Sequence, residues 1–134
     1  MITEPAILER LEKNEARNTK AIFPSVTNHH DTLFGGKALA WMDETAFIAA
    51  TRFSRKRLVT VSSDRIDFKH PIPSGSLVEL VGKVVNVGRT SIKVEVNIYV
   101  ESMYNDHREK AITGTFNFVA VDTDGKPTPV LPID

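Results

Sequence analysis

One carboxylate interrupts an apolar segment of the sequence. Residues 38–53, ALAWMDETAFIAATRF, have the length and composition of a buried helix, yet Asp43 lies in the middle of them. At helical spacing, Asp43 falls on the same face as Leu39, Ala46 and Phe47. A carboxylate in such a place can serve as a general base or as a nucleophile. The commoner use of an aspartate in a helix is to face solvent or an ion pair.

Two glycines and a polar loop come directly before this segment. Residues 28–36 read NHHDTLFGG, and the glycine pair stands where the helix should begin. The first amides of a helix have no partner within it and carry partial positive charge, which suits a developing negative charge. Glycine also lets a ligand approach the backbone closely. We therefore take the amide of Gly36 as a candidate oxyanion donor and Gly35 as a candidate substrate-binding residue, although a tight turn is the simpler interpretation of the pair.

The pattern around these residues predicts one long helix with a strand before it. The apolar segment predicts a helix over residues 37–53. The basic run RFSRKR at its end suits the negative end of a helix. Residues 17–23 are expected to form a short strand that ends at Pro24. Residues 1–16 are expected to form an N-terminal arm or a short helix.

After the helix, the hydrophobic period changes from helix to strand. Short connections join the expected strands, which implies antiparallel pairing, and the third strand alternates cleanly between apolar and polar residues. These strands cover residues 58–68, 76–87, 92–101 and 110–121. Residues 123–134 contain several prolines and are expected to be an irregular tail. One helix cannot cover both faces of such a sheet, so the uncovered apolar surface predicts an oligomer.

The composition argues against several classes of protein. The 134 residues suit one domain, and 17 Lys and Arg balance 17 Asp and Glu, without the basic excess that nucleic-acid binding usually leaves. The absence of cysteine excludes disulfides and thiol nucleophiles and suits a cytoplasmic protein. The charged N-terminal sequence lacks the apolar core of a secretory signal. No stretch approaches the roughly 20 apolar residues of a membrane span.

The four histidines do not form a recognisable metal motif. His29, His30 and Asp31 are adjacent and lack metal-ligand spacing such as H-x-x-x-H, so no metal is expected. We interpret His70, which precedes a proline, as a turn residue. The sequence also lacks the Gly-x-Ser-x-Gly elbow of the α/β-hydrolases and a phosphate-binding P-loop.

Several motifs, in order along the chain, resemble one family. Asn28, the run TLFGG at residues 32–36 and the step MDE at residues 42–44 resemble the acyl-CoA thioesterases of the hotdog fold, in the branch of the cytosolic acyl-CoA hydrolases. The later segments VTVSSDRIDFKHPIPSG, VGRTSIKVEV and TGTFNFVAVD resemble strands of the same family. The resemblance extends over residues 17–122. Asp31 departs from it, because the family often has glycine at that position.

The resemblance implies an α+β hotdog fold, in which an antiparallel sheet wraps around one long central helix, with residues 17–122 as the thioesterase domain. It implies hydrolysis of acyl-CoA to a free carboxylic acid and CoA. Asp43 would be the general base or the nucleophile, and Asn28 would orient water or polarise the thioester. In the family these two residues meet from opposite subunits. We therefore expect a homo-oligomer, a dimer at least, and a trimer of dimers as in the family.

The resemblance also implies where coenzyme A is held. Arg89, Thr90 and Ser91 match the family's CoA-binding strand start, and the Arg89 guanidinium could bind phosphate. Arg57 is a second candidate, although a solvated basic turn is the commoner role of such a residue. No cofactor is expected, because coenzyme A is part of the substrate and product. Neither nucleic acid nor membrane is expected as a partner, and no motif encodes the acyl chain length.

Two alternatives remain open on the sequence. A hotdog hydratase or dehydratase uses a histidine with an acidic partner on the central helix or the loop before it, and residues 37–53 contain no histidine. A non-catalytic acyl-CoA sensor would bind the same ligand without turnover, and an assay of thiol release separates it from an enzyme.

Overall fold

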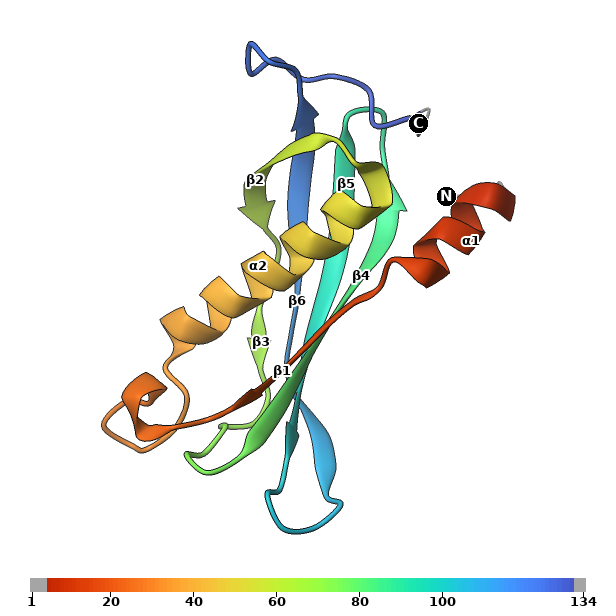
Figure 1. Ribbon diagram of the computed structural model, residues 1–134. Helices are drawn as coiled ribbons and strands as arrows, with labels where there is room; N and C mark the ends of the chain where they lie inside the picture. Colours follow the sequence, from red (N-terminus) through yellow and green to blue (C-terminus); the bar gives the residue numbers. More distant parts are fainter. Residues whose placement is uncertain (1–4, 132–134) are drawn as a thin grey trace.

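One long helix lies across a face of an antiparallel sheet (Figure 1). The computed structural model describes residues 5–131. In chain order the elements are α1 (Pro5–Lys13), β1 (Ala16–Ala21), the 3-10 helix η1 (Pro24–Val26), α2 (Gly35–Ser54), β2 (Arg57–Ser63), β3 (Asp67–Phe68), β4 (Leu77–Val87), β5 (Ser91–Glu101) and β6 (Arg108–Val121).

The sheet has the order β1-β4-β5-β6-β2, and the short strand β3 also pairs with β6. Every pairing is antiparallel, as the short connections predicted. The sheet curls around α2, with the helix in its concave side (Figure 1). This arrangement confirms the expected hotdog architecture.

Helix α2 has clear signals at both ends. It begins at Gly35, two residues before the expected start, because the carbonyl of Phe34 already accepts hydrogen bonds from the amides of Lys37 and Ala38, both at 3.0 Å. It ends at Ser54, after which Arg55 adopts a left-handed conformation with φ of 53°. Such a residue is a common way to stop a helix. The interior is rich in alanine, which favours helix and takes little space.

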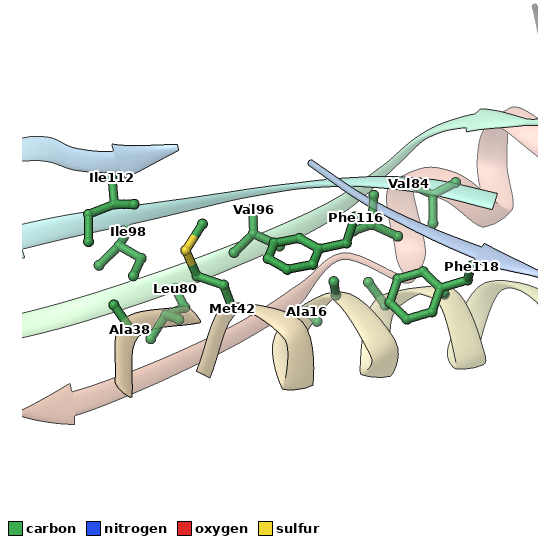
Figure 2. Close-up of a cluster of buried hydrophobic side chains, with 14 of the residues drawn as sticks. Ala16, Ala38, Met42, Leu80, Val84, Val96, Ile98, Ile112, Phe116 and Phe118 are labelled. Atoms are coloured by element: carbon green, nitrogen blue, oxygen red, sulfur yellow. The ribbon is translucent and has the colours of Figure 1, made fainter. Parts of the chain in front are cut away.

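The buried face of α2 packs on the sheet with small side chains. Ala38, Ala46, Ala49 and Ala50 on this face are fully buried, so the helix backbone comes close to the strands. At Gly82 of β4 the approach is so close that an added Cβ would lie 3.2 Å from the carbonyl oxygen of helix residue Thr45. Larger side chains fill the remaining space, as Figure 2 shows for Met42, Leu80, Val96, Phe116 and Phe118.

The expectation of one strand over residues 58–68 is wrong. The chain leaves the sheet after β2 and rejoins it only at β3, with residues 64–66 between them. Ile66 lies directly over Gly114 of β6, where an added Cβ would overlap its Cδ1 atom. The intervening segment is therefore anchored by one side chain in a position that only glycine leaves open.

Strand β2 forms an edge of the sheet and exposes apolar side chains. It pairs with β6 alone, and its Val59 and Val61 are 44% and 55% exposed. On the neighbouring surface of α2, Leu39 and Phe47 are also exposed. The exposed apolar surface thus lies at the edge strand and on α2, whereas the sequence predicted it on the second face of the sheet. Within residues 5–131, no helix is long and apolar enough to cross a membrane.

The two ends of the described chain pack against the same sheet. In α1, Ile7 and Leu11 contact the core, and after β6 the chain returns so that the amide of the buried Val130 donates to the carbonyl of Arg89 at 2.9 Å. Parts of the expected arm and tail, residues 1–4 and 132–134, lie outside the described residues.

Candidate active site

The carboxylate of Asp43 is held by a hydroxyl from the neighbouring edge strand. Thr60 of β2 donates from Oγ1 to Asp43 Oδ1 at 3.0 Å. A register shift between Thr60 and Ser62 places a bulge directly after the donor. Bulges re-aim side chains and are common beside active sites. The other carboxylate oxygen, Oδ2, has no hydrogen-bond partner within residues 5–131.

A pocket of about 400 Å³ opens at this carboxylate. Its lining combines apolar side chains with hydroxyl groups from β2. The lining consists of Leu39, Ala40, Asp43, Thr60, Val61, Ser62, Ser63 and Phe116. Asp43 itself is half-buried, since the face of α2 that it shares with Leu39 and Phe47 is partly a surface of the chain. The predicted apolar surroundings of Asp43 are therefore present, but in the single chain they are partly exposed.

Asn28 organises the loop before α2. Its Oδ1 accepts hydrogen bonds from the amide of His30 at 2.9 Å and from both the amide and the hydroxyl of Thr32, at 3.2 and 3.1 Å. The oxygen end of the side chain is thus occupied, and the Nδ2 group is left as the donor. Asn28 also lines a pocket of about 310 Å³ together with Gly35.

Asp31 stands in a left-handed conformation, with φ of 59°. This region favours glycine, and aspartate is one of the few other residues that tolerate it. The conformation gives a physical reason for the glycine that the family often has at this position. The loop therefore keeps its turn despite the departure, closed by hydrogen bonds from the Asp31 amide to Asn28 O at 3.0 Å and from the Ser74 amide to Asp31 O at 2.9 Å.

The amides of Gly35 and Gly36 stand at the start of α2. Neither amide donates to a backbone carbonyl within residues 5–131, as expected for the first residues of a helix. The two glycines line different pockets. Gly35 lines the pocket of Asn28, whereas Gly36 lines a separate one of about 430 Å³ with Lys37 and Ala40. Ala40 also lines the pocket of Asp43, so Gly36 and Asp43 lie along one side of the helix.

Within one chain, the candidate catalytic residues fall into two separate groups. Asn28 shares a pocket with Gly35, and Asp43 shares another with Thr60. Asp43 lies eight positions after Gly35 in α2, which corresponds to about 12 Å along the helix. A single small carbonyl group cannot touch both ends of that span.

The predicted CoA-binding residues lie at the other end of the sheet. Arg89, Thr90 and Ser91 form the turn into β5, and the Thr90 carbonyl accepts from the amide of Ala120 at 2.8 Å. Arg57 pairs with the residue after Ala120, so it belongs to the same end, where α2 finishes (Figure 1). The side chains of Arg57 and Arg89 are exposed. The structure thus groups these residues with one another and separates them from Asn28.

Sequence reasoning missed the part played by Thr60. A threonine in a strand rich in β-branched residues is ordinary, and only the packing of α2 on β2 brings it to Asp43. The histidines of the loop stay at the surface, where the rings of His29 and His30 lie 3.8 Å apart. His70 lines two pockets, a position that its place before a proline did not suggest.

Known proteins match this chain over most of its length. A sequence model of the thioesterase superfamily matches residues 30–105. The uncharacterised acyl-CoA thioester hydrolase YkhA of Bacillus subtilis is 40% identical over 119 residues, which are 89% of this chain and 69% of that protein.

Solved structures give the same result. An acyl-CoA hydrolase of Staphylococcus aureus, in complex with butyryl coenzyme A, coenzyme A and coenzyme A disulfide, aligns with a TM-score of 0.85 at 34% identity, over 89% of this chain and 73% of that one. Variants of that enzyme have an asparagine, an aspartate or a threonine replaced by alanine. An apo-hexameric acyl-CoA thioesterase aligns with a TM-score of 0.85 at 37% identity, over 89% of this chain and 76% of that one. The chain therefore belongs to the thioesterase superfamily.

Proposed function

We propose that the chain is an acyl-CoA thioesterase that hydrolyses acyl-CoA to a free carboxylic acid and CoA. The observation that carries the proposal is the Asp43 carboxylate, held by the Thr60 hydroxyl in a pocket with an apolar wall. The relatives described above are named for this activity, and one of them was solved with an acyl-CoA and with CoA. The residue types altered in that enzyme are those of Asn28, Asp43 and Thr60.

Asp43 would act through its free oxygen. Thr60 occupies Oδ1, so Oδ2 is available to take a proton from water or to attack the thioester carbonyl directly. Both mechanisms need an ionised carboxylate that keeps its direction, and the hydrogen bond from the Thr60 hydroxyl fixes that direction.

The start of α2 would stabilise the negative charge that develops on the thioester oxygen. The Nδ2 group of Asn28 and the amide of Gly36 are donors without an acceptor in the described chain, and Gly35 would contact the substrate. Fixed donors of this kind contribute more to the transition state than to the ground state. The partial positive charge of the helix start acts in the same direction.

A complete site would need two copies of the chain. Asn28 and Asp43 line separate pockets in one chain, and an exposed apolar surface on β2 and α2 lies around Asp43. Pairing of two chains over this surface would cover Val59 and Val61 and would bring Asn28 of one chain toward Asp43 of the other. The hexameric relative supports a trimer of such dimers.

The other end of the sheet would hold the nucleotide part of the substrate. Arg89 and Arg57 offer exposed guanidinium groups for phosphate, next to the hydroxyls of Thr90 and Ser91. Hydrolysis would need no cofactor beyond the CoA of the substrate. We propose the cytoplasm as the compartment, which the absence of cysteine supports, and the zero net charge gives no support to a nucleic-acid or membrane partner.

The decisive experiment compares Asp43→Ala with wild type in an assay of thiol release by DTNB. We expect kcat to fall by about a thousandfold or more, since a general base contributes roughly that much. Circular dichroism and CoA binding by calorimetry should stay unchanged. The matched control is Glu44→Ala, which removes the exposed carboxylate at the next helix position and should keep wild-type kcat.

Three outcomes would contradict the proposal. Near-normal kcat in Asp43→Ala would remove Asp43 from the mechanism. Binding of acyl-CoA by the wild-type protein without thiol release would indicate the sensor. Hydration of an enoyl-CoA without hydrolysis would indicate the hydratase, although neither α2 nor the residues of the Asp43 pocket include a histidine.

A further inference from the structure

Two pockets adjoin beside Asn28. The first, which we call the inner pocket, has a volume of about 310 Å³ and contains Asn28 and Gly35 in its lining. The second, the outer pocket, has a volume of about 500 Å³ and lies toward the β5–β6 turn. His70 and Pro71, in the segment between β3 and β4 (Figure 1), line both pockets. These two residues therefore stand between the two pockets.

The inner pocket has both polar and apolar groups in its lining. Asn28 and the start of α2 are polar, and the side chains of Leu33, Ile72 and Ile112 are apolar and buried. The ring of Phe68 lies nearby, 3.8 Å from where a Cβ of Gly35 would be. Such a pocket suits a group with a carbonyl at one end and an alkyl chain at the other. An acyl group has that form.

The boundary between the pockets is polar. His70 Nε2 lies 3.8 Å from Glu109 Oε2, and His107 Nε2 lies 3.9 Å from the same oxygen on the side of the outer pocket. An alkyl chain that passes this point must displace water from an imidazole and a carboxylate, which is unfavourable without replacement hydrogen bonds. Beyond the boundary the outer pocket again offers apolar surface, from Val100 and Met103.

We infer that the inner pocket receives the acyl group and that His70 sets the limit of its length, which makes short- to medium-chain acyl-CoA the substrate class. This inference rests on the proposed hydrolase. Each methylene that the inner pocket buries should raise kcat/KM about fourfold. Methylenes that reach His70 should leave kcat/KM unchanged or lower it.

The test measures kcat/KM for straight-chain acyl-CoA from acetyl- to palmitoyl-CoA. The wild-type profile should rise and then level or fall. In His70→Ala the optimum should move to longer chains, with the ratio of palmitoyl- to butyryl-CoA kcat/KM higher by about tenfold or more. His107→Ala is the matched control, because His107 makes a similar contact with Glu109 but lines only the outer pocket, so its profile should equal that of wild type. His70→Gln, which keeps a polar group of similar size, should also keep the wild-type profile.

The outcomes separate this inference from the proposed function. An unchanged profile in His70→Ala, or an equal loss at every chain length, would overturn the role of His70. A flat wild-type profile would overturn the inner pocket as the acyl site while leaving the hydrolase in place. Absence of thiol release from every acyl-CoA would instead overturn the hydrolase itself.

Discussion

At the scale of single residues, a neutral hydroxyl controls the candidate catalytic carboxylate. Thr60 is the only side chain within residues 5–131 that donates to Asp43, at 3.0 Å. This hydrogen bond orients the carboxylate, so its removal should affect turnover more than substrate binding.

Replacement of Thr60 tests this role. We expect Thr60→Val, which keeps the shape and removes the donor, to lower kcat by about a hundredfold, as loss of orientation can do. Thr60→Ser keeps the donor and should retain most of the activity. Steady-state kinetics of both variants give the answer, with KM close to that of wild type. Equal kcat in Thr60→Val and wild type would show that Asp43 does not need the hydroxyl.

Sequence alone was enough to select some of these residues and not others. Asp43 stood out because it interrupts an apolar segment, and Asn28 stood out only because it falls within the motifs of one family. Thr60 fits its strand so well that nothing local distinguishes it, and its role arises only when β2 packs beside α2. The position of His70 between two pockets depends in the same way on the fold of the β3–β4 segment.

At the scale of elements, Gly114 of β6 leaves space for the segment that connects β2 to β3. Ile66 occupies the space over Gly114 that a side chain would fill. We expect Gly114→Ala to lower the free energy of unfolding by about 1–3 kcal/mol, the usual effect of an overpacked core. Ile66→Val removes the atom that would overlap the new methyl group. The double variant should therefore be more stable than Gly114→Ala alone in urea unfolding, and failure of this rescue would contradict the packing described.

Ion pairs connect strands on the face of the sheet away from α2. Arg108 of β6 contacts Glu79 of β4 at 2.7 Å and Glu101 of β5 at 2.9 Å, and Arg17 of β1 contacts Glu79 at 3.3 Å. The hydrogen bond from the Arg108 guanidinium holds the pKa of Glu79 below its ordinary value near 4.5. A lowered pKa in the folded state means that the ionised side chain stabilises the fold above pH 4.5 and that this contribution is lost as the pH falls through the folded pKa.

A variant of Glu79 should show this pH dependence. Glu79→Gln should melt a few degrees below wild type at neutral pH, and the gap should close under acid conditions, below the folded pKa of the wild-type side chain. Thermal unfolding followed by circular dichroism at several pH values measures this difference in melting temperature. A difference that stays constant with pH would mean that the ion pairs do not provide this stability.

The antiparallel pairing of the strands followed from sequence, whereas their order in the sheet and their interruptions did not. Short connections required antiparallel neighbours, and the alternation in residues 92–101 matches β5 as observed. The break at residues 64–66 has no glycine or proline to announce it. It depends on Gly114, which lies far along the chain in β6.

At the scale of the whole molecule, the proposed site needs residues from two chains, and mixed subunits test this. Asn28→Ala and Asp43→Ala should each be inactive alone. After the two variants are unfolded and refolded together, half of the dimers are mixed, and one of the two sites in each mixed dimer has both natural residues. Activity should therefore return to about a quarter of wild type. No recovery, with mixed dimers shown by mass spectrometry, would place the site within one chain.

The hydroxyl that aims Asp43 belongs to a strand with hydrogen bonds along only one side, to β6. Border strands loosen before the interior of a protein does. An isolated chain should thus lose the alignment of its acid on gentle warming while α2 and the central strands stay intact. Because a complete site would need two chains, the contacts that cover the free edge of β2 in the oligomer should set the temperature at which activity is lost, below the melting temperature of the fold.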